Sequence, residues 1–219
     1  MGKIQFQTKE QQIILDEISK NEFIRSHFYF TGGTALSSVY LHHRYSDDLD
    51  LFSEEKFDNQ TILTLVEEWG KKNNFTLQAR FAEVVYIFNL TFKNKARLKV
   101  DFGWYPYKRL NKEKVLDGIE IDSLLDIAVN KLLTVSQRSD VKDFVDLYFL
   151  LQKFTIWDLI EGVRIKFRMK IEPLLLAADL LKIDDFKDMP RMIKLLSLKD
   201  LQAFYKNLAK KLGMEAVEK

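Results

Sequence analysis

Hydrophobic positions along the first fifty residues change from a helical to a strand-like period. Apolar residues at helical spacing predict an amphipathic helix over residues 8–20. A short aromatic strand at 28–30 then runs into the turn Gly32-Gly33-Thr34, after which the helical period returns over 35–40. The order strand, glycine turn, helix is therefore expected near residue 30.

The following segment reads as a strand, a helix and three further strands. A brief apolar strand covers 49–52, and Asp58 is a suitable N-cap for a helix that reaches Trp69. Segments rich in β-branched and aromatic residues then predict successive strands at 75–82, 84–92 and 98–103. Together these strands predict a mixed sheet.

After Pro106 the pattern predicts helices alone. Their expected ranges are 122–136, 140–152, 155–170, 173–182 and 198–213. The fold class predicted is therefore α/β (α+β), with a mixed sheet and flanking helices first and an all-α half second. We expect an α/β domain over 1–105 and a helical domain over 106–219, joined in the loop 104–121 and packed with a cleft between them.

Composition excludes several classes of protein. A chain of 219 residues with 47% hydrophobic residues can bury a core, which argues against disorder, collagen and coiled coil. The 34 Lys and Arg against 32 Asp and Glu leave a net charge of +2, which provides no global field for nucleic acid. The absence of cysteine removes disulfides, thiolate zinc sites and a cysteine nucleophile. With no apolar run of membrane-spanning length and no leader pattern, we expect a cytoplasmic protein with no membrane partner.

Three aspartates are candidates for a metal site. Asp48 and Asp50 occur in SDDLDLF, and because strand side chains alternate, both point to the same face. In LKVDF the same alternation places Asp101 on one face of another strand. If the two strands are neighbours, the three carboxylates offer the hard oxygen ligands that Mg²⁺ prefers. Clustered carboxylates of this kind hold metal ions for phosphoryl transfer.

The glycine turn is a candidate phosphate site. Gly32, Gly33 and Thr34 lie between a predicted strand and a helix, where free backbone N–H groups and the helix dipole attract anions. An ordinary turn is the alternative, because glycine adopts positive φ at little cost. A lone Asp-x-Asp is also common on solvated loops. The joint pattern of glycine turn, Asp-x-Asp and a later strand aspartate favours the chemical interpretation.

At these motifs the sequence resembles a known family. TGGTALSSVYLHHRYSDDLDLF, LKVDF and NKLLTVSQRSDVKDFVDLYFLL are similar to the nucleotidyltransferase toxins of the AbiEii/AbiGii type, in the DNA polymerase β-like nucleotidyltransferase superfamily. The resemblance covers residues 25–152. It implies a nucleotidyltransferase-type sheet, and it assigns catalytic or metal-binding roles to Asp48, Asp50 and Asp101, and nucleotide contacts to Gly32, Gly33, Thr34, Arg44 and Ser46.

The resemblance also implies a reaction and partners. Transfer of a nucleoside monophosphate from an NTP to an acceptor is expected, with the 3′ end of an RNA, namely tRNA, as that acceptor. Mg²⁺ is the expected cofactor, with Mn²⁺ as its substitute. The protein is then the toxin of a toxin–antitoxin or abortive-infection pair, with a cognate antitoxin as partner. Two alternatives are a catalytically silent nucleotide-binding or partner-binding module of the same fold, and an Asp-x-Asp glycosyltransferase, which the glycine turn fits poorly.

The helical half contributes a lysine and two aspartates. Lys131 falls inside an apolar stripe, and Asp143 and Asp146 lie in a segment that is apolar nearly all round. The family motif gives weight to this lysine and to a downstream acidic residue. We therefore predict that Lys131 contacts the nucleotide phosphates and that Asp143 or Asp146 orients it or the acceptor. The alternative is a structural network of the aspartates with Arg138 or Lys131.

Two further features have less specific interpretations. Between Lys93 and Lys114 eight basic residues stand against two acidic ones, with Trp104, Tyr105 and Tyr107 interleaved. This mixture suits base stacking beside phosphate contacts, and a solvated hairpin and loop would show it too. His42 and His43 are expected to be structural, and Asp47, of opposite strand parity, to face solvent.

Overall fold

The computed structural model describes residues 8–111 and 114–217. These residues form two compact units. Unit 1 takes residues 8–40, 46–108 and 114–123, and unit 2 takes 41–45, 109–111 and 124–217. The chain therefore leaves and re-enters unit 1 more than once.

Unit 1 is built on a seven-stranded mixed sheet in the order β3-β4-β5-β2-β1-β7-β6. Strand β2 pairs parallel with β5 and antiparallel with β1, and β1 pairs parallel with β7. The meander β3-β4-β5 is antiparallel throughout. The strands are β1 Tyr29–Thr31, β2 Leu49–Ser53, β3 Phe75–Ala82, β4 Val85–Phe92, β5 Arg97–Trp104, β6 Lys114–Leu116 and β7 Ile119–Ile121.

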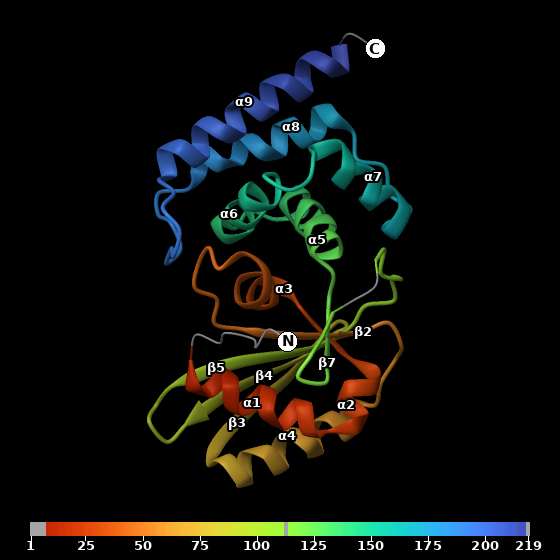
Figure 1. Cartoon of the computed structure of the whole chain (residues 1–219), viewed down its shortest axis with the longest axis vertical. Coiled ribbons are helices and arrows are strands. Elements are labelled where there is room, and N and C mark those ends of the chain that lie inside the picture. The colour runs from red at the N-terminus through yellow and green to blue at the C-terminus, as the bar shows by residue number, and fades with distance from the viewer. Residues whose placement is uncertain (1–7, 112–113, 218–219) are drawn as a thin grey trace. The chain divides into compact units, whose positions relative to one another are not determined.

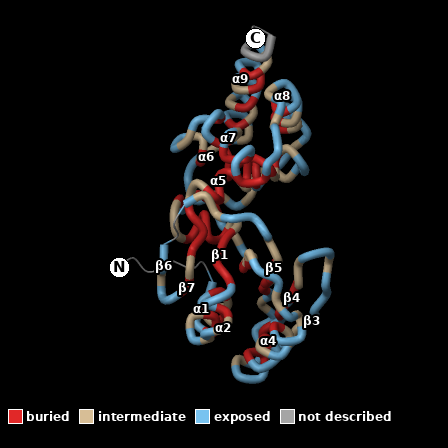
Figure 2. Tube along the Cα trace, turned by 90° about the vertical axis from the view of Figure 1, so that its right-hand side faces the viewer, coloured by how far each residue is buried: buried red, intermediate tan, exposed pale blue. Residues whose placement is uncertain are grey.

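Helices α1 (Lys9–Lys20), α2 (Glu22–His27) and α4 (Asn59–Asn73) lie on one side of this sheet, and α3 (Gly32–Ala35) lies on the other (Figure 1). α3 continues as a π-helix over Leu36–Leu41. On the strands, the apolar side chains Leu98, Val100 and Phe102 of β5 are buried together with Phe88 and Leu90 of β4. On the opposite face, Thr76, Gln78 and Arg80 of β3 and Asn89 and Thr91 of β4 are polar and exposed, whereas Ile87 of β4 is buried. Figure 2 shows β3 largely in the pale blue of exposed residues.

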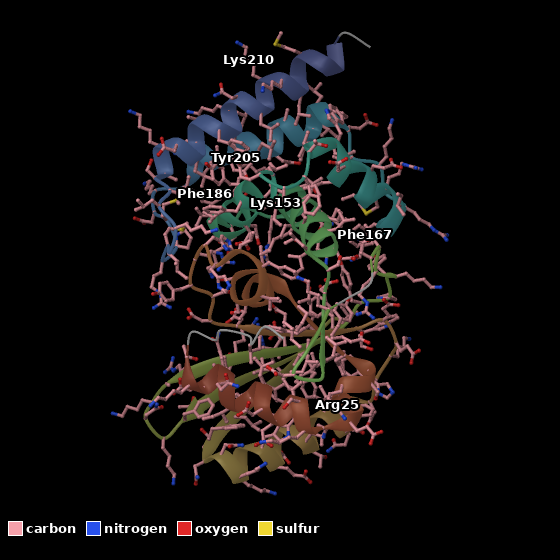
Figure 3. The ribbon with its side chains drawn as sticks, in the orientation of Figure 1. Arg25, Lys153, Phe167, Phe186, Tyr205 and Lys210 are labelled. Carbon is pink, nitrogen blue, oxygen red and sulfur yellow. The ribbon has the colours of Figure 1, made fainter. Side chains whose placement is uncertain are left out.

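Unit 2 is helical. Its helices are α5 Leu124–Gln137, α6 Val141–Leu150, α7 Ile156–Phe167, α8 Pro173–Leu181, the 3₁₀ turn Lys182–Asp185 and α9 Leu198–Val217. Tyr205 of α9 donates its hydroxyl to the carbonyl of Phe144 at 2.6 Å. Phe144 also meets the rings of Tyr205 and Phe186 edge to face, and the latter two residues are labelled in Figure 3. This aromatic cluster joins α6 to α9.

The predicted fold class is confirmed, with a mixed sheet followed by an all-α half. The expectation that strands end near Pro106 is wrong, because β6 and β7 complete the sheet and extend unit 1 past the predicted boundary at residue 105. Each of these strands has three residues, too few to show a period of two. In the described part of the chain, no helix is long and apolar enough to cross a membrane.

A buried ion pair stabilises unit 2. Lys166 of α7 donates to Asp126 of α5 at 2.6 Å, and both side chains are fully buried. Asp126 also accepts hydrogen bonds from the backbone N–H groups of Leu110 and Asn111. The pair therefore fixes the short loop 109–111 and α7 to the same carboxylate.

Removal of the Lys166 charge should destabilise the protein strongly. Lys166→Met keeps most of the volume but removes the buried charge that pairs with Asp126, which should lower the free energy of unfolding by about 3–5 kcal/mol in urea denaturation. Lys170→Met is the matched control, because Lys170 pairs with Glu172 at 2.7 Å while its side chain is 78% exposed. That variant should change stability by less than about 1 kcal/mol. Equal effects of the two substitutions would contradict a stabilising role for the buried pair.

Candidate active site

The sheet brings the three predicted carboxylates to one face. In the parallel pairing of β2 with β5, Asp50 lies opposite Asp101, and on its other side Asp50 lies opposite Thr31 of β1. Asp48 precedes Asp50 by two residues and shares its parity. The predicted neighbourhood of these two strands is thus present in the structure.

Lys99 lies among these carboxylates. Its ammonium nitrogen Nζ is 2.5 Å from Oδ2 of Asp101 and 3.9 Å from Oδ2 of Asp48. Lys99 and Asp101 are two residues apart on β5, so their side chains leave the strand on the same face. The lysine therefore supplies positive charge where carboxylates of two strands approach each other.

The environment shifts the pKa of both members of this pair. Burial raises the pKa of Asp101, and although the hydrogen bond and charge of Lys99 oppose that shift, the net direction is upward. Burial acts to lower the pKa of Lys99, but its hydrogen bond to Asp101 and the nearby carboxylates together raise it. Lys99 therefore remains a cation beside a carboxylate that is poorly solvated.

The donor set fits a hard divalent cation. Oδ1 of Asp101 is buried and has no hydrogen-bond partner within the described residues, an arrangement that costs free energy unless a cation or donor meets that oxygen. Asp48, by contrast, has a half-exposed side chain and is open to an incoming ion. Within residues 8–111 and 114–217, no three His, Cys, Asp or Glu side chains are grouped so that they could hold a metal ion as they stand. Lys99 contacts both Asp48 and Asp101 in this arrangement, so Asp48, Asp50 and Asp101 would hold an ion only after that lysine moves.

The glycine turn and the Asp-x-Asp segment fit against each other. Gly32 has φ +74° and begins α3, and a Cβ at this position would overlap the carboxylate of Asp50. Only glycine combines this backbone conformation with so close an approach. The hydroxyl of Thr34 donates to the backbone carbonyl of Asp48, and its oxygen lies 2.9 Å from the hydroxyl oxygen of Ser46. The two motifs, separate in sequence, therefore form one local structure.

Gln11 secures the chain just before Asp48. Its fully buried amide donates from Nε2 to the backbone carbonyls of Ser46 at 2.8 Å and Asp47 at 3.1 Å. Sequence reasoning did not select Gln11, because a polar residue on a helix gives no sign that its partner lies 35 residues away. Lys99 carried a visible signal, its alternation with Asp101, but without the pairing of strands its contact with Asp48 could not be inferred.

The predicted residues of the helical half meet in unit 2. Lys131 of α5 donates from Nζ to Asp143 at 2.7 Å and is 2.6 Å from Asp146, both on α6. Arg138 donates to the other oxygen of Asp143 at 2.8 Å. The lysine side chain is 11% exposed and the two aspartates are buried. This arrangement is the ion-pair network anticipated as the alternative to a phosphate contact.

Arg44 and His43 complete this buried network. Arg44 donates to both oxygens of Asp146, at 2.6 Å from Nε and 2.8 Å from Nη2, and His43 Nε2 lies 2.7 Å from Oδ1. Burial raises the pKa of Asp146, but Lys131, His43 and Arg44 outweigh it and hold that pKa well below its usual range. Arg44, predicted to contact nucleotide, is 3% exposed and engaged with Asp146.

His43 is held neutral inside this cluster. Burial lowers its pKa, the hydrogen bond and charge of Asp146 oppose that shift, and the net direction is downward. His42, its neighbour, is exposed and has φ +47°. The expectation that His43 is structural agrees with its complete burial.

The free energy of unfolding should depend on pH through His43. Because its pKa is lowered in the folded state, the unfolded chain binds more protons below about pH 6.5, and stability should fall by up to about 1.4 kcal/mol per pH unit as pH decreases from there. In urea denaturation across that range, His43→Asn should flatten this dependence. His42→Asn should retain the wild-type slope, since asparagine tolerates positive φ. An unchanged slope in His43→Asn would contradict the assignment.

Solved structures share the fold of this chain. JHP933 from Helicobacter pylori has a similar structure, with a TM-score of 0.56 and 16% identity over 96% of this chain and 95% of that one. MenT4, a nucleotidyltransferase toxin from Mycobacterium tuberculosis H37Rv, gives a TM-score of 0.56 and 13% identity over 93% and 83% of the two chains. An uncharacterized protein of Aquifex aeolicus (strain VF5) is 35% identical over 157 residues, 70% of each chain.

A family model matches most of the sequence. The model of the AbiEii nucleotidyl transferase toxins, from type IV toxin–antitoxin systems, aligns with residues 13–216. That span includes the glycine turn, the three carboxylates and the helical half. The chain therefore belongs to the AbiEii toxin family of nucleotidyltransferases.

Proposed function

We propose that this nucleotidyltransferase transfers a nucleoside monophosphate from an NTP to the 3′ hydroxyl of an RNA acceptor, with tRNA as the expected RNA and Mg²⁺ or Mn²⁺ as cofactor. The observation that carries the proposal is the register of β2 with β5, which sets Asp50 beside Asp101 next to the glycine turn. Family membership supports a role as the toxin of a toxin–antitoxin pair, acting in the cytoplasm with an antitoxin as partner.

The proposed roles follow from where each residue lies. Asp48, Asp50 and Asp101 would hold the divalent ion, which when bound neutralises the charge of the transferring phosphate and activates the attacking hydroxyl. In this proposal the backbone N–H groups of the turn Gly32-Gly33-Thr34 bind the phosphates of the NTP. Thr34, in contact with Ser46 and with the carbonyl of Asp48, links that turn to the Asp-x-Asp segment.

Asp101 is suited to accept a hydrogen bond from the acceptor hydroxyl. Its buried oxygen Oδ1 has no donor among the residues described. We assign it contact with the acceptor hydroxyl.

Loss of either Asp-x-Asp carboxylate should abolish transfer. Asp48→Asn and Asp50→Asn each remove a charged ligand without removing volume, so incubation with Mg²⁺, radiolabelled NTPs and total tRNA should show a loss of at least about 10²-fold in labelled tRNA. The free energy of unfolding should be nearly unchanged. Asp117→Asn, in the exposed turn between β6 and β7, is the matched control and should transfer at the wild-type rate.

Wild-type transfer by both site variants would refute the assignment. Absence of labelling by the wild-type protein with every NTP would favour the alternative of a silent nucleotide-binding or partner-binding module. Induction in bacteria provides a second test of the toxin role, because the wild type should arrest growth and the two site variants should not. Equal arrest by wild type and variants would indicate an effect of overexpression.

Lys131 and Asp143 were predicted to be catalytic. Because both belong to a buried ion-pair network, a test of their role must separate an effect on the transfer rate from an effect on stability. If Lys131 only contacted the phosphates, its substitution would reduce the rate and leave stability nearly unchanged. With Lys131 paired to two buried aspartates, we now expect Lys131→Met to lower the free energy of unfolding by about 3–5 kcal/mol. Transfer per folded molecule then decides the role of the lysine.

The two outcomes are distinct. A loss of about 10²-fold in transfer per folded molecule would support contact of Lys131 with the phosphates. Transfer within a few-fold of wild type, together with the loss of stability, would assign Lys131 and Asp143 to the buried network alone. Urea denaturation gives the folded fraction for this normalisation. Lys142→Met, which removes an exposed cation of α6 outside this network, is the matched control for stability.

A further inference from the structure

A cavity opens beside the carboxylates on the exposed side of the sheet. Its volume is about 410 Å³, within the range of small-molecule pockets, and Asp48 and Lys99 lie at its edge. Further polar side chains that line it come from three adjacent strands: Thr76 and Gln78 of β3, Asn89 and Thr91 of β4, and Arg97 of β5. We call these five residues with Lys99 the polar strand face.

Strand register arranges the polar strand face in two rows. Lys99 lies opposite Asn89, which lies opposite Gln78. Arg97, Thr91 and Thr76 form the second row in the same way. Side chains of directly paired residues project from the same face of a sheet. Both rows therefore project from the face of the sheet that carries Asp101.

The chemistry of the polar strand face suits an anionic strand with hydrogen-bonding bases. Its two amides and two hydroxyls both donate and accept hydrogen bonds, and Arg97 and Lys99 carry positive charge. Arg80 adds a cation on the same face, two residues from Gln78 along β3, and is close enough to lower the pKa of Asp101 against the larger effect of burial. None of the six residues is acidic, although Asp47 and Asp48 border the cavity.

Strand order separates the cavity from the glycine turn. The turn follows β1, Asp48 directly precedes β2, Asp50 belongs to β2, and Asp101 belongs to β5. The cavity covers β5, β4 and β3. The carboxylates therefore lie between the turn and the cavity along the sheet. A transfer reaction needs its two substrates on either side of the reacting atoms. If the triphosphate occupies the turn, the polar strand face is left for the acceptor.

We propose that the polar strand face binds the terminal nucleotide of a single-stranded RNA 3′ end, with its phosphate at Arg97 and Lys99 and its base at Asn89 and Gln78. This inference rests on the proposed function and names the acceptor subsite within it. Amide side chains can hydrogen-bond the Watson–Crick edge of an unpaired base, which is how proteins recognise single-stranded RNA ends. The nearby carboxylate of Asp101 then faces the terminal hydroxyl.

Variants on the second row and on the amides test this subsite without altering the carboxylates. Arg97 and Asn89 are exposed, so Arg97→Glu and Asn89→Ala should fold normally. With tRNA as acceptor, we expect Arg97→Glu to raise the KM for tRNA by about 10-fold or more, with the KM for NTP and the rate at saturating tRNA unchanged. Asn89→Ala should raise the same KM by a few-fold.

A charge-matched control lies on the other side of the sheet. Lys71→Glu reverses an exposed charge on α4 and should leave both KM values at wild type. Fluorescence anisotropy with a short 5′-labelled single-stranded RNA, in the absence of NTP, measures the subsite independently of catalysis. In this assay Arg97→Glu should weaken RNA binding. The slope of the logarithm of the association constant against the logarithm of the salt concentration should also become shallower, by the amount expected for the loss of about one phosphate contact.

The outcomes separate this inference from the proposed function. If wild-type protein labels tRNA but Arg97→Glu and Asn89→Ala keep the wild-type KM for tRNA, the subsite is refuted and the function stands. A rise in the KM for NTP instead would place the nucleotide in the cavity and also refute it. If the protein labels no RNA, loss of RNA binding by Arg97→Glu would still support the subsite, and unchanged binding would overturn it.

Discussion

The approach of Gly32 to Asp50 is the constraint on which the candidate active site depends. A side chain at residue 32 would occupy the space of the Asp50 carboxylate, and the positive φ of Gly32 turns the chain from β1 into α3 at that point. The Thr34 hydroxyl then anchors the segment that carries Asp48. Parallel pairing of β2 with β5 adds Asp101. The glycine turn and the carboxylates are thereby positioned by one set of contacts in unit 1.

Much of unit 1 could be predicted because its signals are local. Alternation of apolar and acidic residues predicted which side chains of β2 and β5 point to the same face of the sheet. The glycine turn predicted the transition from strand to helix. The contacts of Lys99 with Asp48 and of Gln11 with Ser46 could not be predicted, since each depends on which distant segments become neighbours. Strands β6 and β7 were missed because three residues show no period.

The helical half illustrates a different limit. A lysine within an apolar stripe of a helix indicates a buried ammonium group that needs an anionic partner. The sequence also indicated correctly that Asp143 and Asp146 need partners. It could not rank the partners, because Arg44 and His43 lie about a hundred residues upstream. In the buried network three permanent cations face two carboxylates, with His43 neutral. Such a cluster is stable only when every member is present.

The interleaving of the two units bears on how this chain can be divided. Residues 41–45 belong to unit 2 although they lie between the glycine turn and the Asp-x-Asp segment of unit 1. A fragment beginning at residue 106 would contain every helix of unit 2 from α5 onward but would lack Arg44, the bidentate partner of Asp146. It would also lack the bridge between Arg44 and Met192 that joins this segment to the chain before α9. The packing of the helical half therefore includes residues that lie far upstream of it, and an exchange of that half without residues 41–45 would remove the bidentate partner of Asp146.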